Sequence, residues 1–401
     1  MLVGHERFVT GRPGGKRLSL RFSDLSELDM SGRELSDADF AGSLFDGCKM
    51  VRAKLQRANL FGCSFRGADM RHAAMNRADI RGSCLRGANL SGADLTGADF
   101  REGQLAIPHP RKGLDVVRHE TRKGEADQAI FSGATLDGSN FGGVSAFAAD
   151  FTDCSLKGAK MAGANLKDAN LAGAILENVE LAGANLQGAN LRGAVITGVD
   201  SAGMRLLGAD LSTCLSTPDE DAGRVQTLLA RAAGNRKWCE SGGREEKPAN
   251  FDGEDLRSLA GGLRGGVLTA MSAKGACLVG LDLAGAQLQG ANLEGADLRG
   301  ACLVGADLRG ARLVGANLIK ADLRKAALCA LPLGGGRTTT THMEQARMRY
   351  AAVEAADLSG ALLDQADLSG ANFSGARLIG ASFRGAALDT AIGMDFGQEA
   401  A

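Results

Sequence analysis

The chain has 401 residues, of which 44% are hydrophobic and 4% aromatic, and it contains 57 glycines. So many glycines with so few aromatic residues argue against an ordinary globular core. The 46 Lys and Arg residues nearly balance the 47 Asp and Glu residues, and the net charge of −1 argues against direct nucleic-acid binding.

An apolar residue recurs at every fifth position, from Leu20 through Leu25 and Met30 to Leu105. Five residues turn a helix by about 140°, so these side chains would scatter around its surface. In a flat strand, an odd step places successive side chains on opposite faces. We therefore predict a chain that bends at each repeat, so that every large apolar side chain points inward.

The other positions of each unit agree with such a bend. Residues 88–92, Ala-Asn-Leu-Ser-Gly, show the order: a small residue, Asp or Asn, the large apolar residue, a free position and usually Gly. Glycine tolerates the backbone of a tight turn, and Asp or Asn can bond its own backbone there. Repetition at a fixed period is typical of a solenoid, whose units bury their apolar residues by stacking on their neighbours.

These units resemble those of the pentapeptide repeat family. The resemblance implies an all-β solenoid, a right-handed quadrilateral β-helix with four five-residue faces per coil, in which residues twenty apart stack. We interpret the breaks in the repeat as short helical or loop insertions. The predicted core ladder consists of central leucines: Leu20, Leu25, Leu60, Leu85, Leu90, Leu95, Leu166, Leu171, Leu181, Leu186, Leu191, Leu283, Leu288, Leu293, Leu298, Leu308, Leu318 and Leu368.

The first predicted solenoid spans residues 20–216, after an N-terminal cap or entry element at residues 1–19. In that element, Phe8 is followed by a glycine-rich turn. A loop insertion at residues 106–130 interrupts the solenoid, and we predict a hairpin with Gly124 in its turn. This insertion is either a tolerated surface loop or a partner-binding loop. Its candidate contact residues are basic: Arg111, Lys112, Arg118, Arg122 and Lys123.

Residues 217–250 are predicted to form a helical linker and cap. Thr217 would be the N-cap, Pro218 the first helical residue and Gly234 the end of the helix. The apolar stripe of Val225, Leu228, Leu229 and Ala232 must dock either on a solenoid or on a partner. Leu229 and Trp238 are the candidate contact residues here, and Trp238 precedes a glycine-rich turn as Phe8 does.

The second predicted solenoid spans residues 251–396, with two extra residues near Gly261 and an insertion at residues 331–352. Thr341 and Glu344 have the spacing of a capping box, which predicts a second helix carrying Tyr350, a further candidate contact residue. At the far end, Ile392, Met394 and Phe396 are expected to leave the repeat, to cap the last coil or to form a homodimer contact.

We predict neither catalytic residues nor a metal or cofactor. The five histidines are far apart in sequence, and the nine cysteines include no C-x-x-C pair. Cys48, Cys63, Cys154 and Cys214 occupy the small inward position, which favours reduced core residues. The first residues lack a signal-peptide apolar region and no apolar run is long enough to span a membrane, so a cytoplasmic protein is expected.

The sequence therefore favours a non-enzymatic scaffold or adaptor, of bacterial type, that presents its insertions to a protein partner. The alternative comes from the resemblance: relatives in the family mimic duplex DNA and bind or protect DNA gyrase. Such mimicry needs about one negative charge per 1.7 Å of axis, and the near-neutral charge of this chain argues against it.

Overall fold

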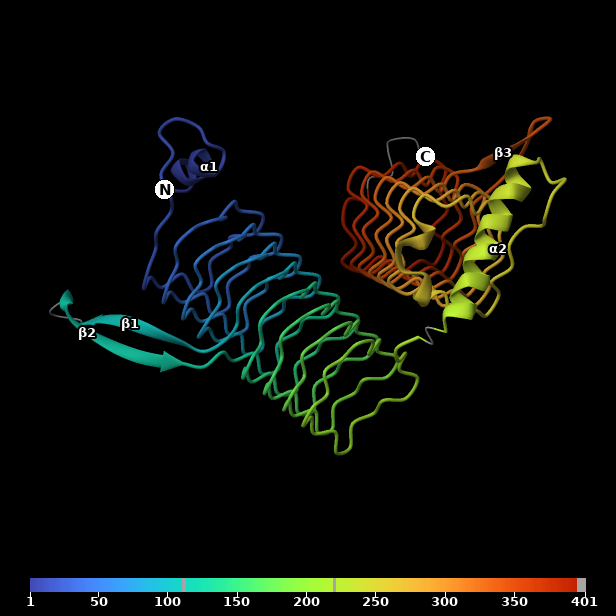
Figure 1. Ribbon diagram of the computed structural model, residues 1–401. Helices are drawn as coiled ribbons and strands as arrows, with labels where there is room; N and C mark the ends of the chain where they lie inside the picture. Colours follow the sequence, from blue (N-terminus) through green and yellow to red (C-terminus); the bar gives the residue numbers. More distant parts are fainter. Residues whose placement is uncertain (110–112, 219–220, 395–401) are drawn as a thin grey trace. The chain divides into compact units, whose positions relative to one another are not determined.

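The computed structural model describes residues 1–109, 113–218 and 221–394. It divides the chain into two compact units, Met1–Thr217 and Pro218–Ala401. Each unit is built from stacked coils of chain, as Figure 1 shows. Within the described residues, no helix is both long and apolar enough to cross a membrane.

Neighbouring coils pair in parallel at single residues. Asn59, for example, pairs with Asp39 on the preceding coil and with Asp79 on the following one, both twenty residues away. The Leu60 N–H donates to the Asp79 carbonyl oxygen at 2.8 Å, and the Asn59 N–H donates to that of Ala38 at 2.9 Å. Four such pairing residues, five apart, recur in every regular coil. The predicted stacking of residues twenty apart is therefore confirmed.

The central residues of the repeats form two continuous apolar cores, one in each unit. All the predicted core leucines are buried except Leu20 and Leu25, which are only partly buried because they lie on the first coil. Phenylalanines on successive coils stack face to face, as Phe45 and Phe65 do with ring centroids 4.9 Å apart. Each repeat thus depends on its neighbours for burial.

Some inward positions hold Ser or Cys instead of Ala, and these side chains bond the backbone of the preceding coil. The Ser83 hydroxyl donates to the Leu60 carbonyl at 2.8 Å, and the Cys63 thiol donates to that of Phe40 at 3.1 Å. Cys48, Cys154 and Cys214 donate in the same way. Burial raises the pKa of the Cys63 thiol to about 12.

The raised pKa predicts that Cys63 resists alkylation while the protein is folded. Only the thiolate reacts, and at pH 8 almost none of a thiol with such a pKa is ionised. Treating native protein with iodoacetamide should leave Cys63 unmodified, whereas protein unfolded in urea should react at this residue. Peptide mass spectrometry measures both. Rapid labelling of Cys63 in the folded protein would contradict its placement in the core.

In the first unit, a helix and a hairpin depart from the coils. Helix α1 is Leu2–Val9, and strands β1 (Gly103–His109) and β2 (Gly113–Arg122) form an antiparallel hairpin that leaves the side of the unit in Figure 1. The hairpin therefore begins three residues before the predicted insertion and ends eight residues before its predicted end at residue 130. Coil pairing resumes at Glu125, which pairs with Cys84. The prediction that Gly124 lies in the hairpin turn is wrong, because Gly124 follows β2. Leu105 lies in β1 and not in a coil.

In the second unit, helix α2 spans Ala222–Glu240. Thr217 is not its N-cap: that residue is Asp221, whose side chain accepts a bond from the Arg224 N–H. The helix also continues through Gly234, where we expected it to end. Leu228 is buried in the second core, and Val225, Leu229 and Ala232 pack against it. The apolar stripe therefore docks on the coils of its own unit.

The predicted helix at residues 341–353 is wrong. Met343, Met348 and Val353 are buried central residues of regular coils, and His342 pairs with Arg312. The insertion there is a small hairpin of β3 (Leu331–Gly334) and β4 (Arg337–Thr339). The extra residues expected near Gly261 lie in the short 3₁₀-helix η1, Arg257–Leu263. Ile392 still pairs with Asn372, so the repeat continues through it, and Phe396 lies outside the described residues.

Both units begin with a helix that bonds the first coil through one fully buried polar side chain. The Leu18 N–H donates to Nδ1 of His5 in α1 at 3.0 Å. The Ala249 N–H donates to Oδ1 of Asn235 in α2 at 2.7 Å. Leu18 and Ala249 each stand two residues before the first central residue, Leu20 or Phe251. The two helices therefore cap their coils in the same manner.

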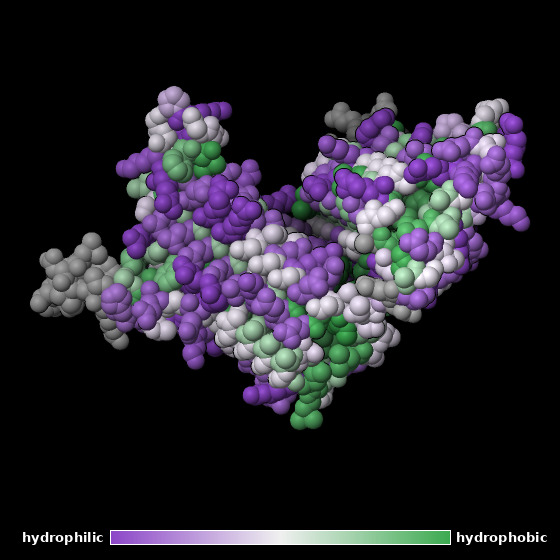
Figure 2. Space-filling view, in the orientation of Figure 1, coloured by the Kyte–Doolittle hydropathy of each residue, from purple (hydrophilic) through white to green (hydrophobic). Residues whose placement is uncertain are grey.

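The last coil of the first unit exposes more apolar side chain than the first coil, which α1 caps. Leu207 is 79% exposed and Leu211 is 38% exposed, and Figure 2 shows apolar surface at this end of the unit. No helix within the described part of residues 1–217 covers this coil. The two ends of the first unit are therefore unlike each other.

Candidate partner-binding face of the first unit

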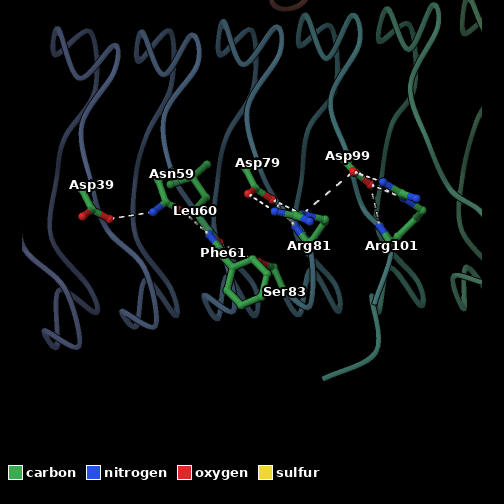
Figure 3. A network of polar contacts seen from close by, with 9 residues as sticks. All are labelled: Asp39, Asn59, Leu60, Phe61, Asp79, Arg81, Ser83, Asp99 and Arg101. Carbon is green, nitrogen blue, oxygen red and sulfur yellow. Dashed lines mark hydrogen bonds and ion pairs between the residues drawn. The ribbon is translucent and has the colours of Figure 1, made fainter. Parts of the chain in front are cut away.

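A column of polar side chains runs along one side of the first unit. Asp39, Asn59, Asp79 and Asp99 stand on successive coils, twenty residues apart (Figure 3). The Asn59 amide donates to the Asp39 carboxylate at 2.8 Å. The Asn59, Asp79 and Asp99 side chains also accept from the N–H two residues further on. These bonds are those of Asx turns, so the column is built by the repeat itself.

Two arginines are held flat against this column. The Arg81 guanidinium makes two bonds to the Asp79 carboxylate, at 2.9 and 2.7 Å, and Arg101 bonds Asp99 in the same way at 3.0 and 2.8 Å. Burial raises the pKa of Asp99, but the bonds from Arg101 outweigh it and hold that pKa below its ordinary value. Half-exposed pairs such as these add little stability. Their effect is to fix where the guanidinium groups lie.

The same arginines adjoin the base of the hairpin. The Arg81 guanidinium lies over the Phe61 ring, 5.3 Å from its centroid. Gly103, the first residue of β1, lies against the far end of this ring: a Cβ on Gly103 would stand 2.5 Å from Cε2 and Cζ of Phe61. An open cavity of about 500 Å³ lies beside Arg81 and Arg101, bounded also by Glu102 and Gly142. The hairpin therefore begins beside Phe61 and Arg81, whose positions are set by contacts within the coils.

The second strand is anchored on the same turn of the coil. Arg122 donates from Nη1 to the Gly62 carbonyl at 2.8 Å. Leu105 is 3% exposed and lies within about 3 Å of the position that a Cβ on Gly62 would take. Both strands of the hairpin are thus fixed at their base.

The predicted basic contact residues fall in different places. Arg122 is an anchor of the hairpin base, whereas Lys123 is exposed directly after β2. Arg118 lies in β2, opposite Ile107. Arg111 and Lys112 lie outside the described residues. Arg118 and Arg122 thus both belong to β2, and Lys123 follows the strand directly.

The three other predicted contact residues lie in the second unit. Leu229 packs against the core and approaches Gly262, so it belongs to the cap. Trp238 lies at the end of α2 beside Gly243. The Tyr350 ring covers Gly370 on the next coil, where a Cβ would stand 2.5 Å from the ring. These residues do not form one site with the hairpin.

The sequence did not point to Phe61 or to the first residues of the hairpin as parts of a site. Phe61 occupies the free position of its repeat, and Arg81 stands twenty residues later. An aromatic residue at a free position, twenty residues before an arginine, could have indicated this stacked pair. Among the residues that the structure describes, no group of three His, Cys, Asp or Glu could hold a metal ion.

The family model for pentapeptide repeats matches stretches covering residues 34–105, 129–213, 273–329 and 356–392, more than half of the chain. The cyanobacterial pentapeptide repeat protein Rfr23 from Cyanothece 51142 is 32% identical over 34% of this chain and 90% of its own, with a TM-score of 0.27.

Two further solved structures are more distant. HetL from Nostoc, involved in heterocyst differentiation regulation, is 18% identical over 98% of this chain and 96% of its own, with a TM-score of 0.14. The plasmid-mediated fluoroquinolone resistance protein QnrB1 is 19% identical over 54% and 96%, with a TM-score of 0.25. A search of curated proteins gave no significant match. With the family model matched along both units and residues twenty apart paired, the chain belongs to the pentapeptide repeat family.

Proposed function

We propose that the protein is a non-enzymatic scaffold or adaptor, and that the β1–β2 hairpin and the face that anchors it form its main protein-binding surface. The observation that carries this proposal is the double anchoring of the hairpin, through Gly103 on Phe61 and through Arg122 on Gly62. A loop that is merely tolerated needs no such anchors. A protruding element on a fixed base presents its residues at little entropic loss on binding.

The proposal includes the organisation of the chain. Two solenoid modules, at residues 20–216 and 251–396, would each follow its own cap, at residues 1–19 and 217–250. We further propose a four-sided coil in both. Repeat faces resemble one another along a solenoid, so an insertion of unique composition is the better determinant of partner choice.

Replacing residues 106–121 with a short Gly-Ser linker tests this function. The change leaves Leu105 and Arg122 in place, so the coils should keep their melting temperature. We expect partner proteins that co-purify with the full chain from its native cells to be lost. The matched control replaces residues 333–338, the tip of the β3–β4 hairpin, and should retain them. Retention of every partner by the first variant, with its fold intact, would move the binding surface to the repeat faces.

Modulation of DNA gyrase is the alternative. Mimicry of DNA requires uninterrupted negative charge, but the column of Asp79 and Asp99 is neutralised by Arg81 and Arg101. We therefore propose that this protein is not a strong gyrase ligand. Inhibition of supercoiling by purified protein at low micromolar concentration, or protection of gyrase from a quinolone, would favour the alternative.

The C-terminal end of the second unit is our proposed site for a homodimer. Leu388 is 36% exposed there, and Phe383 and Met394 are only partly buried against the core. Light scattering of the full chain and of a Leu388→Glu variant measures this directly, since only a dimer through this end would be weakened by the change.

A further inference from the structure

The second to fourth coils of the first unit carry an excess of positive charge. Between residues 47 and 93, nine Lys and Arg stand against two Asp, although the chain as a whole is balanced. Lys54 pairs with Ala74 across the coils, so residues 52–57 and 72–77 lie side by side. We call the cationic and imidazole side chains of these two segments the basic strip: Arg52, Lys54, Arg57, His72 and Arg77. Figure 2 shows hydrophilic surface over this half of the unit.

Only part of this charge is neutralised within the fold. Lys54 is 3.3 Å from the Glu34 carboxylate, and Arg57 makes two bonds to Asp37, at 2.8 and 2.5 Å. These bonds from Arg57 lower the pKa of Asp37. Among the described residues, no ion pair is found for the exposed side chains of Arg52 and Arg77. The strip therefore keeps two positive charges that the fold does not use.

The backbone supplies a second, independent observation. Arg52, Arg57, His72 and Arg77 have φ between 56° and 59°, whereas glycines fill the equivalent places on the following coil, at Gly92 and Gly97. A residue with a side chain is strained in this left-handed conformation.

Some side chains in this conformation cover a glycine on the next coil. The Phe22 ring, for example, covers Gly42. The aliphatic stem of Arg77 lies 3.6 Å from the position that a Cβ on Gly97 would take. Arg52 and Arg77 therefore stand at the bend of their repeats with exposed guanidinium groups that make no ion pair in the described fold, so their charge is available to a partner.

We propose that the basic strip binds a short acidic segment of a partner protein. The proposal rests on the scaffold function and names the chemistry of one contact in it. The strip is two coils wide, or about 10 Å at a strand spacing of about 4.8 Å. Carboxylates flank it on both sides, Glu34 and Asp37 on the preceding coil and Asp94 on the following one.

The flanking carboxylates decide between partner classes. Duplex DNA carries about one negative charge per 1.7 Å of its axis, so a duplex lying along the coils would extend past the strip onto Glu34, Asp37 and Asp94. A segment with two or three carboxylates fits within the strip and avoids this repulsion. The surface therefore matches an acidic peptide better than a nucleic acid.

Fluorescence polarisation with a labelled peptide that carries three consecutive glutamates between Gly-Ser flanks tests the proposal, because exposed charge pairs weaken with salt. The intact protein should bind the peptide at low ionic strength, more weakly as salt rises. The double variant R52Q/R77Q should lose about tenfold in affinity. The variant R52G/R77G should lose as much but melt at a higher temperature, because glycine relieves the left-handed strain. A structural role for the two arginines would instead lower the melting temperature of both variants.

The matched control removes two exposed charges elsewhere on the same solenoid, as K160Q/K167Q, and should change the affinity less than about twofold. Absence of saturable peptide binding, or an equal loss in the control, would overturn the proposal. Tighter binding of a duplex DNA probe than of the peptide would overturn it in favour of a nucleic acid. If the strip fails these tests while the replacement of residues 106–121 still abolishes partner capture, the scaffold function stands without it.

Discussion

Replacing Leu171 with Lys is expected to unfold the first unit, whereas Lys at the neighbouring Ala172 should leave it folded. Leu171 is 1% exposed in the middle of the first core, and its N–H donates to the Asn190 carbonyl on the next coil. A buried, unpaired ammonium together with the lost leucine destabilises by more than about 4 kcal/mol. Since each coil is buried by its neighbours, the damage extends along the unit.

Ala172 is the matched control because it occupies the outward free position of the same repeat, where it is only partly buried. Its lysine can extend into water, so the expected change is within about 0.5 kcal/mol. Urea unfolding followed by circular dichroism measures both variants. Similar losses at the two positions would contradict the assignment of Leu171 as inward and Ala172 as outward.

The five-residue period carried most of the fold, because each repeat encodes its own bend and its own contact with the core. The period did not show whether an apolar residue at the fifth position lies in a coil or in a segment that leaves the coils. Leu105 keeps the period but belongs to β1, where it packs on the turn at Gly62. Local sequence cannot show this difference, since burial against either surface satisfies the same leucine.

The error at residues 341–353 has a physical origin in the repeat itself. Each repeat has two inward positions, the central residue and the small residue three places later, as at Met343 and Ala346. A spacing of three therefore arises without any helix, and helical periodicity read over a short window cannot exclude a coil. Tyr350 completed the apparent stripe, but it lies in a left-handed turn with φ of 56°.

The boundaries of α2 were decided by tertiary structure. Thr217 is engaged by the last coil of the first unit, where its hydroxyl accepts from the Gly198 N–H at 3.5 Å. It cannot also cap a helix, and Asp221 takes that role. The helix continues through Gly234 because the next residue, Asn235, bonds the coils from within the helix. It ends before Gly242 and Gly243, which have left-handed backbones. The contacts of Thr217 and Asn235 are with residues 14 to 34 positions away in the sequence, so a local pattern cannot show them.

Replacing Asn235 with Ala is expected to undock α2. No motif or periodicity in the sequence singles out this residue. The side chain is fully buried. Its amide nitrogen donates to the Val267 and Thr269 carbonyls at 3.0 and 3.2 Å, and its oxygen accepts from the Ala249 N–H. Removing it leaves three backbone groups at the edge of the first coil without these partners. At about 1–3 kcal/mol for each buried group left unpaired, we expect a loss of roughly 3–5 kcal/mol.

Trp238 makes this expectation measurable, because it is the single tryptophan of the chain and lies in α2. Its fluorescence in urea should report an earlier transition in Asn235→Ala than in the native protein. Arg236→Ala, an exposed neighbour on the same helix, is the control and should shift the transition little. Asn235→Asp separates the bonds from the packing: its carboxylate still accepts from Ala249 but repels the two carbonyls, so it should be about as unstable as the alanine variant. If both variants unfold with the native protein, α2 is held by its apolar stripe alone and Asn235 does not cap the coil.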